Sequence, residues 1–179
     1  MTTLIPKYDQ GSTGAVNRAI NLKLYESLSV LDFGADNTGT NDSTTAIQNA
    51  ITSALSSGKS LYFPAGTYSY TSSTTFLIDT LTAQKSLTIY GDGKETTIIN
   101  LNANNKIFTV NSGENGSGPT FEFNLKGLTF NVINPSTNSN ATIFYVCRTA
   151  GDWGAHFYTE DCYFGGFTNC AIQGIRAFN

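Results

Sequence analysis

The stretch from residue 29 to residue 70 reads SVLDFGADNTGTNDSTTAIQNAITSALSSGKSLYFPAGTYSY. Its first apolar run stops at Gly34, and the polar segment 36–42 predicts a loop because Asp, Asn and Gly favour turns. A second apolar run, 61–63, predicts a strand that ends at Pro64, since aliphatic and aromatic residues favour strands and proline interrupts them. A loop and a turn therefore frame the residues between them.

These intervening residues predict a helix over 43–57. Small and aliphatic side chains recur along one helical face: Ala46, Ile47, Ala50, Ile51, Ala54 and Leu55. Either Asp42 or Ser43 is expected to accept a hydrogen bond from the first turn, and Gly58 is expected to end the helix in the left-handed region. Because the helix has a single narrow apolar stripe, that stripe must pack against the strands that follow.

Three ordered segments of this stretch resemble the entry module of a known family. They are SVLDFGA at 29–35, TNDSTTAIQ at 40–48 and FPAGTY at 63–68. Together they resemble the N-terminal module of the pectate-lyase-like right-handed β-helix family, as found in bacteriophage tailspikes and tail fibres. The resemblance implies that the helix closes the first rung of a solenoid as a lid, because a terminal repeat has no neighbour to bury its apolar end.

The second half of the chain, from residue 86 onward, consists of short strand-like pieces that recur at fixed offsets. Gly91 and Gly127 occur in similar contexts 36 residues apart (127 − 91 = 36). Two longer matches recur at similar offsets: IFTV at 107–110 with IFYV at 143–146, 36 residues apart, and the F-x6-F octets 123–130 with 157–164, 34 residues apart (157 − 123 = 34). Such recurrence predicts stacked rungs. A β-sandwich also consists of many short strands and is the alternative.

The predicted fold class is therefore mainly β, a right-handed parallel β-helix (solenoid) with an N-terminal capping α-helix, preceded by an extended arm and a short helix. The predicted regions are an arm and short helix at 1–28, an entry and capping module at 29–85, and the first rungs at 86–179. The last apolar segment has no polar cap, so we expect the rungs either to continue beyond Asn179 or to be covered by a partner.

The region 1–28 contains two candidate contact surfaces. Its turn-rich start, which has no clear period, predicts an extended arm, and the family resemblance implies that this arm attaches to a phage tail or baseplate protein through Ile5, Pro6 and Tyr8. Four apolar residues follow at four-residue steps and predict one helical stripe: Val16, Ile20, Leu24 and Leu28. The stripe packs either on the first rung of the same chain or on its symmetry mates in a homotrimer.

The composition argues against several partners. Charged residues make up 13% of the 179 residues and the net charge is −3, so no nucleic acid is predicted as a partner. No apolar run approaches the roughly 18 residues of a membrane span, and no signal peptide is visible, so no membrane insertion is predicted. A virion protein made in the host cytosol needs no signal. The virion, at the phage tail, is therefore the predicted location.

The chain contains few groups with the spacing of a metal site. Three cysteines lack any CxxC spacing and predict buried thiols, with a disulfide or metal site as the alternative: Cys147, Cys162 and Cys170. His156 has no second histidine at ligand spacing. Asp36 and Asp42 are explained by a loop aspartate and a capping aspartate rather than by calcium binding. We predict no metal and no cofactor.

Polysaccharide-cleaving members of the family imply a pair of carboxylates about 5 to 9.5 Å apart. Asp152 and Glu160 are the candidate pair, and three aromatic residues beside them are candidate contacts for sugar rings: Trp153, Tyr158 and Tyr163. Alternatively, Asp152 lies in a glycine-flanked turn and the aromatic residues pack in the core or between subunits. Glu160 and Asp161 are adjacent, so in a regular strand they would point to opposite faces.

The working hypothesis is a structural virion protein, the N-terminal part of a phage tailspike or tail fibre. Its residues 1–28 would attach it to the tail, and its solenoid would support recognition of a bacterial surface polysaccharide. The alternative is a polysaccharide depolymerase, a lyase or glycoside hydrolase, complete in this chain. A third possibility is a sugar-binding module without catalysis. Under the working hypothesis the chain itself is not an enzyme, and any depolymerase site lies downstream of Asn179.

Overall fold

A computed structural model of the chain describes residues 6–9, 11–71, 76–79, 86–104, 106–112, 121–148, 155–168 and 172–175. Within these ranges the chain forms the helices α1 (Ile20–Leu24) and α2 (Thr44–Ser57), the 3-10 helix η1 (Val30–Phe33) and sixteen strands. The strands β1 (Lys7–Tyr8) and β2 (Arg18–Ala19) pair antiparallel. The chain is therefore mainly β with few helices. None of the described helices is long and apolar enough to cross a membrane.

The other fourteen strands form three parallel sheets. The first sheet contains, in spatial order, β14 (Ala155–Glu160), β11 (Phe121–Lys126), β8 (Ser86–Gly91), β5 (Leu61–Phe63) and β3 (Leu28–Ser29). The second contains β15 (Tyr163–Gly165), β12 (Thr129–Val132), β9 (Thr97–Leu101), β6 (Gly66–Tyr70) and β4 (Thr38–Asp42). The third contains β16 (Ile172–Ile175), β13 (Thr142–Arg148), β10 (Lys106–Ser112) and β7 (Phe76–Asp79).

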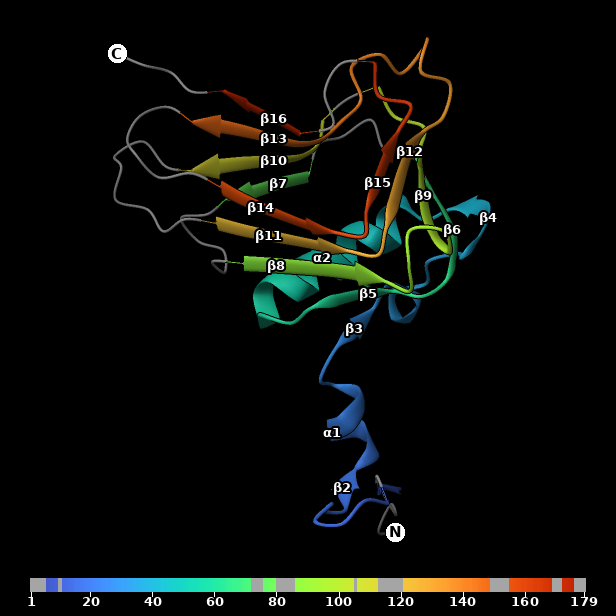
Figure 1. Cartoon of the computed structure of the whole chain (residues 1–179), viewed down its shortest axis with the longest axis vertical. Coiled ribbons are helices and arrows are strands. Elements are labelled where there is room, and N and C mark those ends of the chain that lie inside the picture. The colour runs from blue at the N-terminus through green and yellow to red at the C-terminus, as the bar shows by residue number, and fades with distance from the viewer. Residues whose placement is uncertain are drawn as a thin grey trace.

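Consecutive strands of these sheets belong to different sheets, and from β5 onward the chain visits the first, second and third sheets in turn and then returns to the first (Figure 1). In the turn before it, α2 follows β4 where a strand of the third sheet would stand. Each strand pairs in parallel with the strand one turn earlier, as β11 pairs with β8, β12 with β9 and β13 with β10. Among the described strands, β1 and β2 form the only antiparallel pair. This is a β-helix-like arrangement, and it is incompatible with the alternative of an antiparallel β-sandwich.

The register confirms the predicted offsets. Phe123 lies opposite Phe157 and Phe130 opposite Phe164, and the rings of both pairs stack, with centroids 5.2 and 5.9 Å apart. At these pairs the first and second sheets thus have the predicted offset of 34 residues, and the third sheet has the predicted offset of 36, because 106–112 pairs with 142–148. Each stacked pair repeats one side chain at one position of successive rungs, which is why the repeat is visible in the sequence.

Gly91 and Gly127 meet where the first sheet turns into the second. A Cβ on Gly91 would lie 2.6 Å from the carbonyl oxygen of Gly127, and a Cβ on Gly127 would lie 2.8 Å from that of Gly91. Gly127 also has φ +63°, which other residues rarely adopt. Successive rungs therefore approach too closely at this corner for any side chain.

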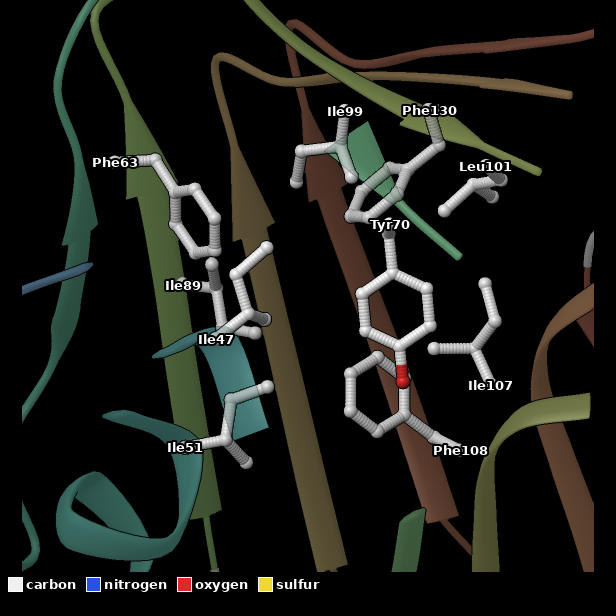
Figure 2. A pocket seen from close by; sticks show the side chains of 10 residues that line it. All are labelled: Ile47, Ile51, Phe63, Tyr70, Ile89, Ile99, Leu101, Ile107, Phe108 and Phe130. Carbon is white, nitrogen blue, oxygen red and sulfur yellow. The ribbon is translucent and has the colours of Figure 1, made fainter. Parts of the chain in front are cut away.

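The core lies between the three sheets and α2. Ile47 and Ile51 of α2 point toward Phe63 and Ile89 of the first sheet and Tyr70 of the second (Figure 2). All the side chains in this view surround a cavity of about 20 Å³ lined almost entirely by carbon. Because a water molecule needs two or more polar partners to occupy such a space, this cavity is dry. The apolar stripe of the predicted helix therefore faces the strands that follow it, as expected.

The helix α2 begins and ends where the sequence indicates. Its N-cap is Ser43, and Gly58 ends it with φ +66°. Of the two predicted acceptors it is Asp42 that acts, because its Oδ1 accepts hydrogen bonds from the N–H and the hydroxyl of Thr44, at 3.3 and 2.7 Å. The Ser43 hydroxyl instead accepts a bond from the N–H of Asp36, at 2.9 Å. The helix packs against η1, β3, β5 and β8, at the start of the stack.

The prediction of one helical stripe in the N-terminal region was wrong. Only residues 20–24 are helical, Val16 precedes them, and Leu28 lies in β3, where it pairs with Leu61 and packs against the core. A helix of this length is only marginally stable without packing partners, and Leu28 pairs in a sheet instead. Val16 and Leu24 are 71% and 70% exposed, so they do not pack on the first rung of this chain.

The start of the arm folds back on itself instead of remaining extended. The pairing of β1 with β2 is extended by a hydrogen bond from the N–H of Ile20 to the carbonyl of Pro6, at 2.9 Å. Together with α1 this hairpin projects away from the sheets (Figure 1). Among the predicted contact residues of the arm, Pro6 and Tyr8 are exposed, whereas Ile5 lies outside the described residues.

Candidate functional site

An open groove of about 370 Å³ lies on the outer side of the second sheet. Three strands of that sheet and the turn before β9 contribute its lining: Lys94, Glu95, Ile98, Thr129, Asn131 and Tyr163. Residues alternate along each strand, so Ile99 and Phe130 are buried while their neighbours Ile98 and Asn131 face outward. The groove therefore presents outward-facing residues of three successive rungs.

The register aligns one row of these side chains across the strands. Thr129 of β12 lies opposite Ile98 of β9 on one side and opposite Tyr163 of β15 on the other. In the next outward row, Asn131 lies opposite Asn100 and donates a hydrogen bond from its side-chain Nδ2 to the Oδ1 of Asn100, at 3.4 Å. The strands hold both rows, whereas Lys94 and Glu95 come from the turn before β9.

Tyr163 has the most exposed aromatic ring of the groove, at 58%. A Cβ at Gly165 would lie 2.7 Å from the Cε1 atom of this ring and 3.2 Å from the Oδ1 of Asn131. The ring therefore lies against the bare backbone of Gly165, and any side chain there would displace it. One aromatic surface beside polar groups is an arrangement that can pack against the apolar face of a ligand while its edge is hydrogen-bonded.

An ion pair and a hydrogen bond hold the turn that carries Lys94 and Glu95. The Nζ of Lys94 lies 2.9 Å from the Oδ1 of Asp161, and the hydroxyl of Thr129 donates to the carbonyl of Lys94, at 2.7 Å. The hydrogen bond between Lys94 and Asp161 raises the pKa of the lysine amine and lowers the pKa of the carboxyl. Glu95 is exposed and has no ion pair within the described part of the chain.

The predicted site residues separate onto two surfaces. Tyr163 lines the groove, whereas Tyr158 lies on β14 of the first sheet, 53% exposed, with its ring edge-on to that of His156 at a centroid distance of 6.3 Å. Glu160 ends the same strand and forms an ion pair with Lys126 at 2.8 Å. Asp152 and Trp153 lie outside the described residues, so the candidate carboxylate pair stays a prediction.

The expectation that Glu160 and Asp161 would point to opposite faces does not apply. The strand β14 ends at Glu160, and Asp161 has φ +49°, so the alternation of a regular strand stops between them. Both carboxylates lie on the surface, and each forms an ion pair with a lysine of an earlier rung, Lys126 and Lys94.

Asp36 organises its own loop. Its carboxylate accepts hydrogen bonds from the N–H and hydroxyl of Thr38, at 2.9 and 2.7 Å, and from the N–H and side-chain Nδ2 of Asn41, at 2.7 and 3.0 Å. These bonds hold the pKa of Asp36 far below its usual range. Burial opposes ionisation of Asp42, but hydrogen bonds from Thr44 and Thr71 outweigh it and lower the pKa of that carboxyl. The loop-and-cap interpretation of both aspartates is confirmed.

The thiol prediction is met in part. Cys162 is half-buried and is not in a disulfide, and burial raises the pKa of its thiol. The side chain of Cys147 and the whole of Cys170 lie outside the described residues. Within the described ranges, no group of three or more His, Cys, Asp and Glu side chains is arranged to hold a metal ion.

A second corner contact holds the turn after β5. The Asp92 carboxylate accepts hydrogen bonds from the Tyr62 hydroxyl, at 2.7 and 2.8 Å, and from the N–H of Ala65, at 2.8 Å. The bond to Asp92 raises the pKa of Tyr62 to about 12. The ring of Tyr62 also stacks on that of Tyr90, with centroids 5.0 Å apart. Asp92 therefore has a structural role at the corner.

Sequence reasoning missed most of the groove, namely Lys94, Glu95, Ile98, Thr129 and Asn131, and also Gly165, on which the ring of Tyr163 lies. The repeat offsets were the signal that could have found part of it. An offset of 34 between the F-x6-F octets places Thr129 beside Tyr163 (163 − 129 = 34), as the register has it. The position of Lys94 next to Asp161 has no such signal, because it depends on how the corners turn.

The family model described as rhamnogalacturonase A/epimerase, pectate lyase-like, matches residues 27–126. No curated protein sequence matches the chain. Among solved structures, ORF18 of Geobacillus virus E2 is similar with 21% identity and a TM-score of 0.53, over 84% of this chain and 31% of that one.

The A-module of the Azotobacter vinelandii mannuronan C-5 epimerase AlgE6 is similar with 20% identity and a TM-score of 0.57, over 84% of this chain and 42% of that one. The tailspike protein of Acinetobacter phage vB_ApiP_P1 aligns with 21% identity and a TM-score of 0.43, over 90% of this chain and 31% of that one. The chain thus spans 31% to 42% of the length of these solved chains. At these identities the likeness shows the fold alone.

Proposed function

The chain belongs to the rhamnogalacturonase A/epimerase, pectate-lyase-like family, and from this membership we propose that it contacts a polysaccharide through the groove on its second sheet. We propose further that it is part of a phage tailspike or tail fibre and that the polysaccharide belongs to the bacterial surface. The viral protein that shares the fold, ORF18 of Geobacillus virus E2, supports a phage origin. The three segments from SVLDFGA to FPAGTY support it independently.

The observation that carries the proposal is the aromatic ring of Tyr163 held against Gly165 beside a polar row. Sugar rings have one face rich in C–H groups and an edge rich in hydroxyls, so a flat ring next to amide and hydroxyl groups suits them. The strands keep these groups in place before a ligand arrives, which lowers the entropic cost of binding. An open groove also admits a long polymer without requiring a chain end.

The N-terminal region fits attachment to a tail or baseplate protein. It projects from the sheets and exposes several large apolar side chains: Tyr8, Val16, Leu22, Leu24 and Tyr25, the last with the Nζ of Lys59 over its ring at 5.3 Å. Apolar groups of this kind become buried in obligate assemblies. In a homotrimer some of them would pack around the threefold axis, and α2 would serve as the lid of the solenoid.

A second candidate function is modification of the polysaccharide, by cleavage or epimerisation. The groove contains a cation, Lys94, between two carboxylates, Asp161 and Glu95. Acid and base groups around an open polymer site are what such reactions need. Asp152 and Glu160 remain the proposed pair for a hydrolase. The mannuronan C-5 epimerase that shares the fold supports this class by its name.

One experiment separates these functions. The chain and its Tyr163→Ala variant are incubated with capsular and lipopolysaccharide preparations, and both binding and new reducing or unsaturated ends are measured. Binding that Tyr163→Ala weakens about tenfold or more, without new ends, supports recognition. Tyr158→Ala is the matched control, because that ring is similarly exposed and lies on the first sheet. Equal binding by all three proteins would refute the groove as the contact surface.

Attachment is tested separately by native mass and by capture. The proposal expects a homotrimer that binds a tail or baseplate protein, and it expects Val16→Ser with Leu24→Ser to weaken both assembly and capture. A clean soluble monomer without affinity for any tail component contradicts the attachment proposal while leaving the groove proposal open.

A further inference from the structure

Resting on the proposed function, we infer that the groove selects uncharged stretches of polysaccharide and discriminates against polyuronates. The inference concerns the chemical class of the ligand, and it departs from the acidic polymer that the word mannuronan names for the Azotobacter epimerase. It depends on the charges around the groove and on the balance of hydrogen-bond donors and acceptors that line it.

The cations beside the groove are already neutralised. Lys94 pairs with Asp161 at 2.9 Å, and Lys126 at the same corner pairs with Glu160 at 2.8 Å. Binding a uronate carboxylate through either lysine would require breaking an ion pair to form an equivalent one, so nothing is gained. In pectin- or alginate-like ligands each sugar carries such a carboxylate, and the groove offers it no free cation among the described residues.

The charge that is not neutralised by these ion pairs repels a uronate carboxylate. Glu95 lines the groove, is exposed, and has no ion pair within the described ranges. Counting the two lysines and the three carboxylates named above gives 2 − 3 = −1 at this corner. One uronate carboxylate about 7 Å from Glu95 loses roughly threefold in affinity at the dielectric constant of water. Two or more such groups along a polymer bring the discrimination to about tenfold.

The neutral groups of the groove point to the same ligand class. The hydroxyl of Thr129 donates to the carbonyl of Lys94, and Asn131 donates one amide hydrogen to Asn100. Much of the donor capacity is thus used within the protein, while the carboxylate of Glu95 and the Oδ1 of Asn131 can accept. Sugar hydroxyls can donate to these acceptors, whereas a carboxylate can only accept. The site therefore matches hydroxyl-rich sugars better than acidic ones.

The test uses ligand pairs that differ only in charge. The full chain is titrated with polygalacturonate and with its carboxyl-reduced galactan, and with mannuronan and its carboxyl-reduced mannan. A panel of capsular and O-antigen polysaccharides is added, each uronate-bearing member also in carboxyl-reduced form. All titrations contain a chelator so that no divalent cation bridges carboxylates, and Tyr163→Ala identifies binding that occurs in the groove.

We expect Tyr163-dependent binding of carboxyl-reduced or neutral polymers to be about tenfold tighter than that of the matching polyuronates. Glu95→Gln should tighten polyuronate binding about threefold and leave the neutral polymers unchanged. Glu122→Gln is the matched control, because Glu122 is equally exposed but lies on β11 of the first sheet, and it should alter neither.

Two results would overturn the inference, and they differ in what else they overturn. Tyr163-dependent binding that is as tight for a polyuronate as for its reduced form refutes charge selection and leaves the proposed function standing. Absence of Tyr163-dependent binding to every polymer in the panel refutes the proposed function and the inference with it.

Discussion

Replacing Gly91 by alanine should destabilise the solenoid more than its single methyl group suggests. A Cβ at this position would lie 2.6 Å from the carbonyl oxygen of Gly127, 2.8 Å from the Cβ of Thr97 and 2.8 Å from the Cδ2 of Leu128. The first two atoms cannot rotate away, and Leu128 is fully buried. The rungs would have to separate at the corner to admit the methyl group.

Overpacking of this kind costs about 1–3 kcal/mol of folding free energy, and we place Gly91→Ala at the upper end because two rigid atoms oppose it. Alanine also restricts the unfolded chain, which returns roughly 0.4–1 kcal/mol. The net loss of about 2–2.6 kcal/mol lowers the Tm by about 4–10 °C for a chain of this size.

Thermal and urea unfolding followed by far-ultraviolet circular dichroism measure this loss. The matched control is Gly34→Ala, because Gly34 has φ +88° but no atom within 4 Å of the added methyl group. That variant carries only the left-handed backbone penalty, about 1–2 kcal/mol before the same unfolded-state gain. If Gly91→Ala unfolds at the same temperature as Gly34→Ala, or above it, the close approach of the rungs at this corner is refuted.

Three further predictions concern α2, the corner and the groove. Asp42→Ala removes the carboxylate that accepts hydrogen bonds from the N–H and hydroxyl of Thr44 at the start of α2, and it should cost about 1 kcal/mol, seen as a Tm lower by roughly 2–4 °C, whereas Asp42→Asn should retain most of the stability. Because folding raises the pKa of Tyr62 to about 12, the contribution of this residue to stability is present below about pH 10 and is lost as pH rises from 10 to 12. Ultraviolet titration should show that the Tyr62 phenol ionises at higher pH than an ordinary tyrosine, and Asp92→Asn should move its pKa toward 10. An unchanged titration in the Asp92→Asn variant contradicts the assignment. Gly165→Ala should displace the ring of Tyr163 and weaken polysaccharide binding about fivefold with an unchanged Tm, and undiminished binding would contradict the positioning role.

The rungs were predictable because a β-helix repeats its pattern along the chain. Phe123 and Phe157 fill the same position in successive rungs, so the distance between them in the sequence equals the pairing offset in the sheet. The helix α2 was predictable for a similar reason, since its apolar stripe, its capping Asp42 and its terminating Gly58 are all local signals.

The prediction of a helical stripe in the N-terminal region was wrong, because the residues at its four-residue steps do not lie in one helix. Periodicity indicates which residues could share a helical face, but it does not weigh the helix against competing partners. Leu28 pairs with Leu61 in the first sheet, and only the tertiary structure makes that partner available. The remaining helix ends at Leu24, which leaves Val16 and Leu24 exposed.

The sequence by itself therefore determined the family, the repeat and the helix α2, because those depend on neighbours along the chain or on equal positions in successive rungs. The groove was decided by the tertiary structure. Its Lys94 bonds to Asp161, 67 residues further along, and the carbonyl of Lys94 accepts a hydrogen bond from the hydroxyl of Thr129, 35 residues further along. Such contacts form where turns of different rungs come together, and the sequence contains no repeat that records how those turns bend.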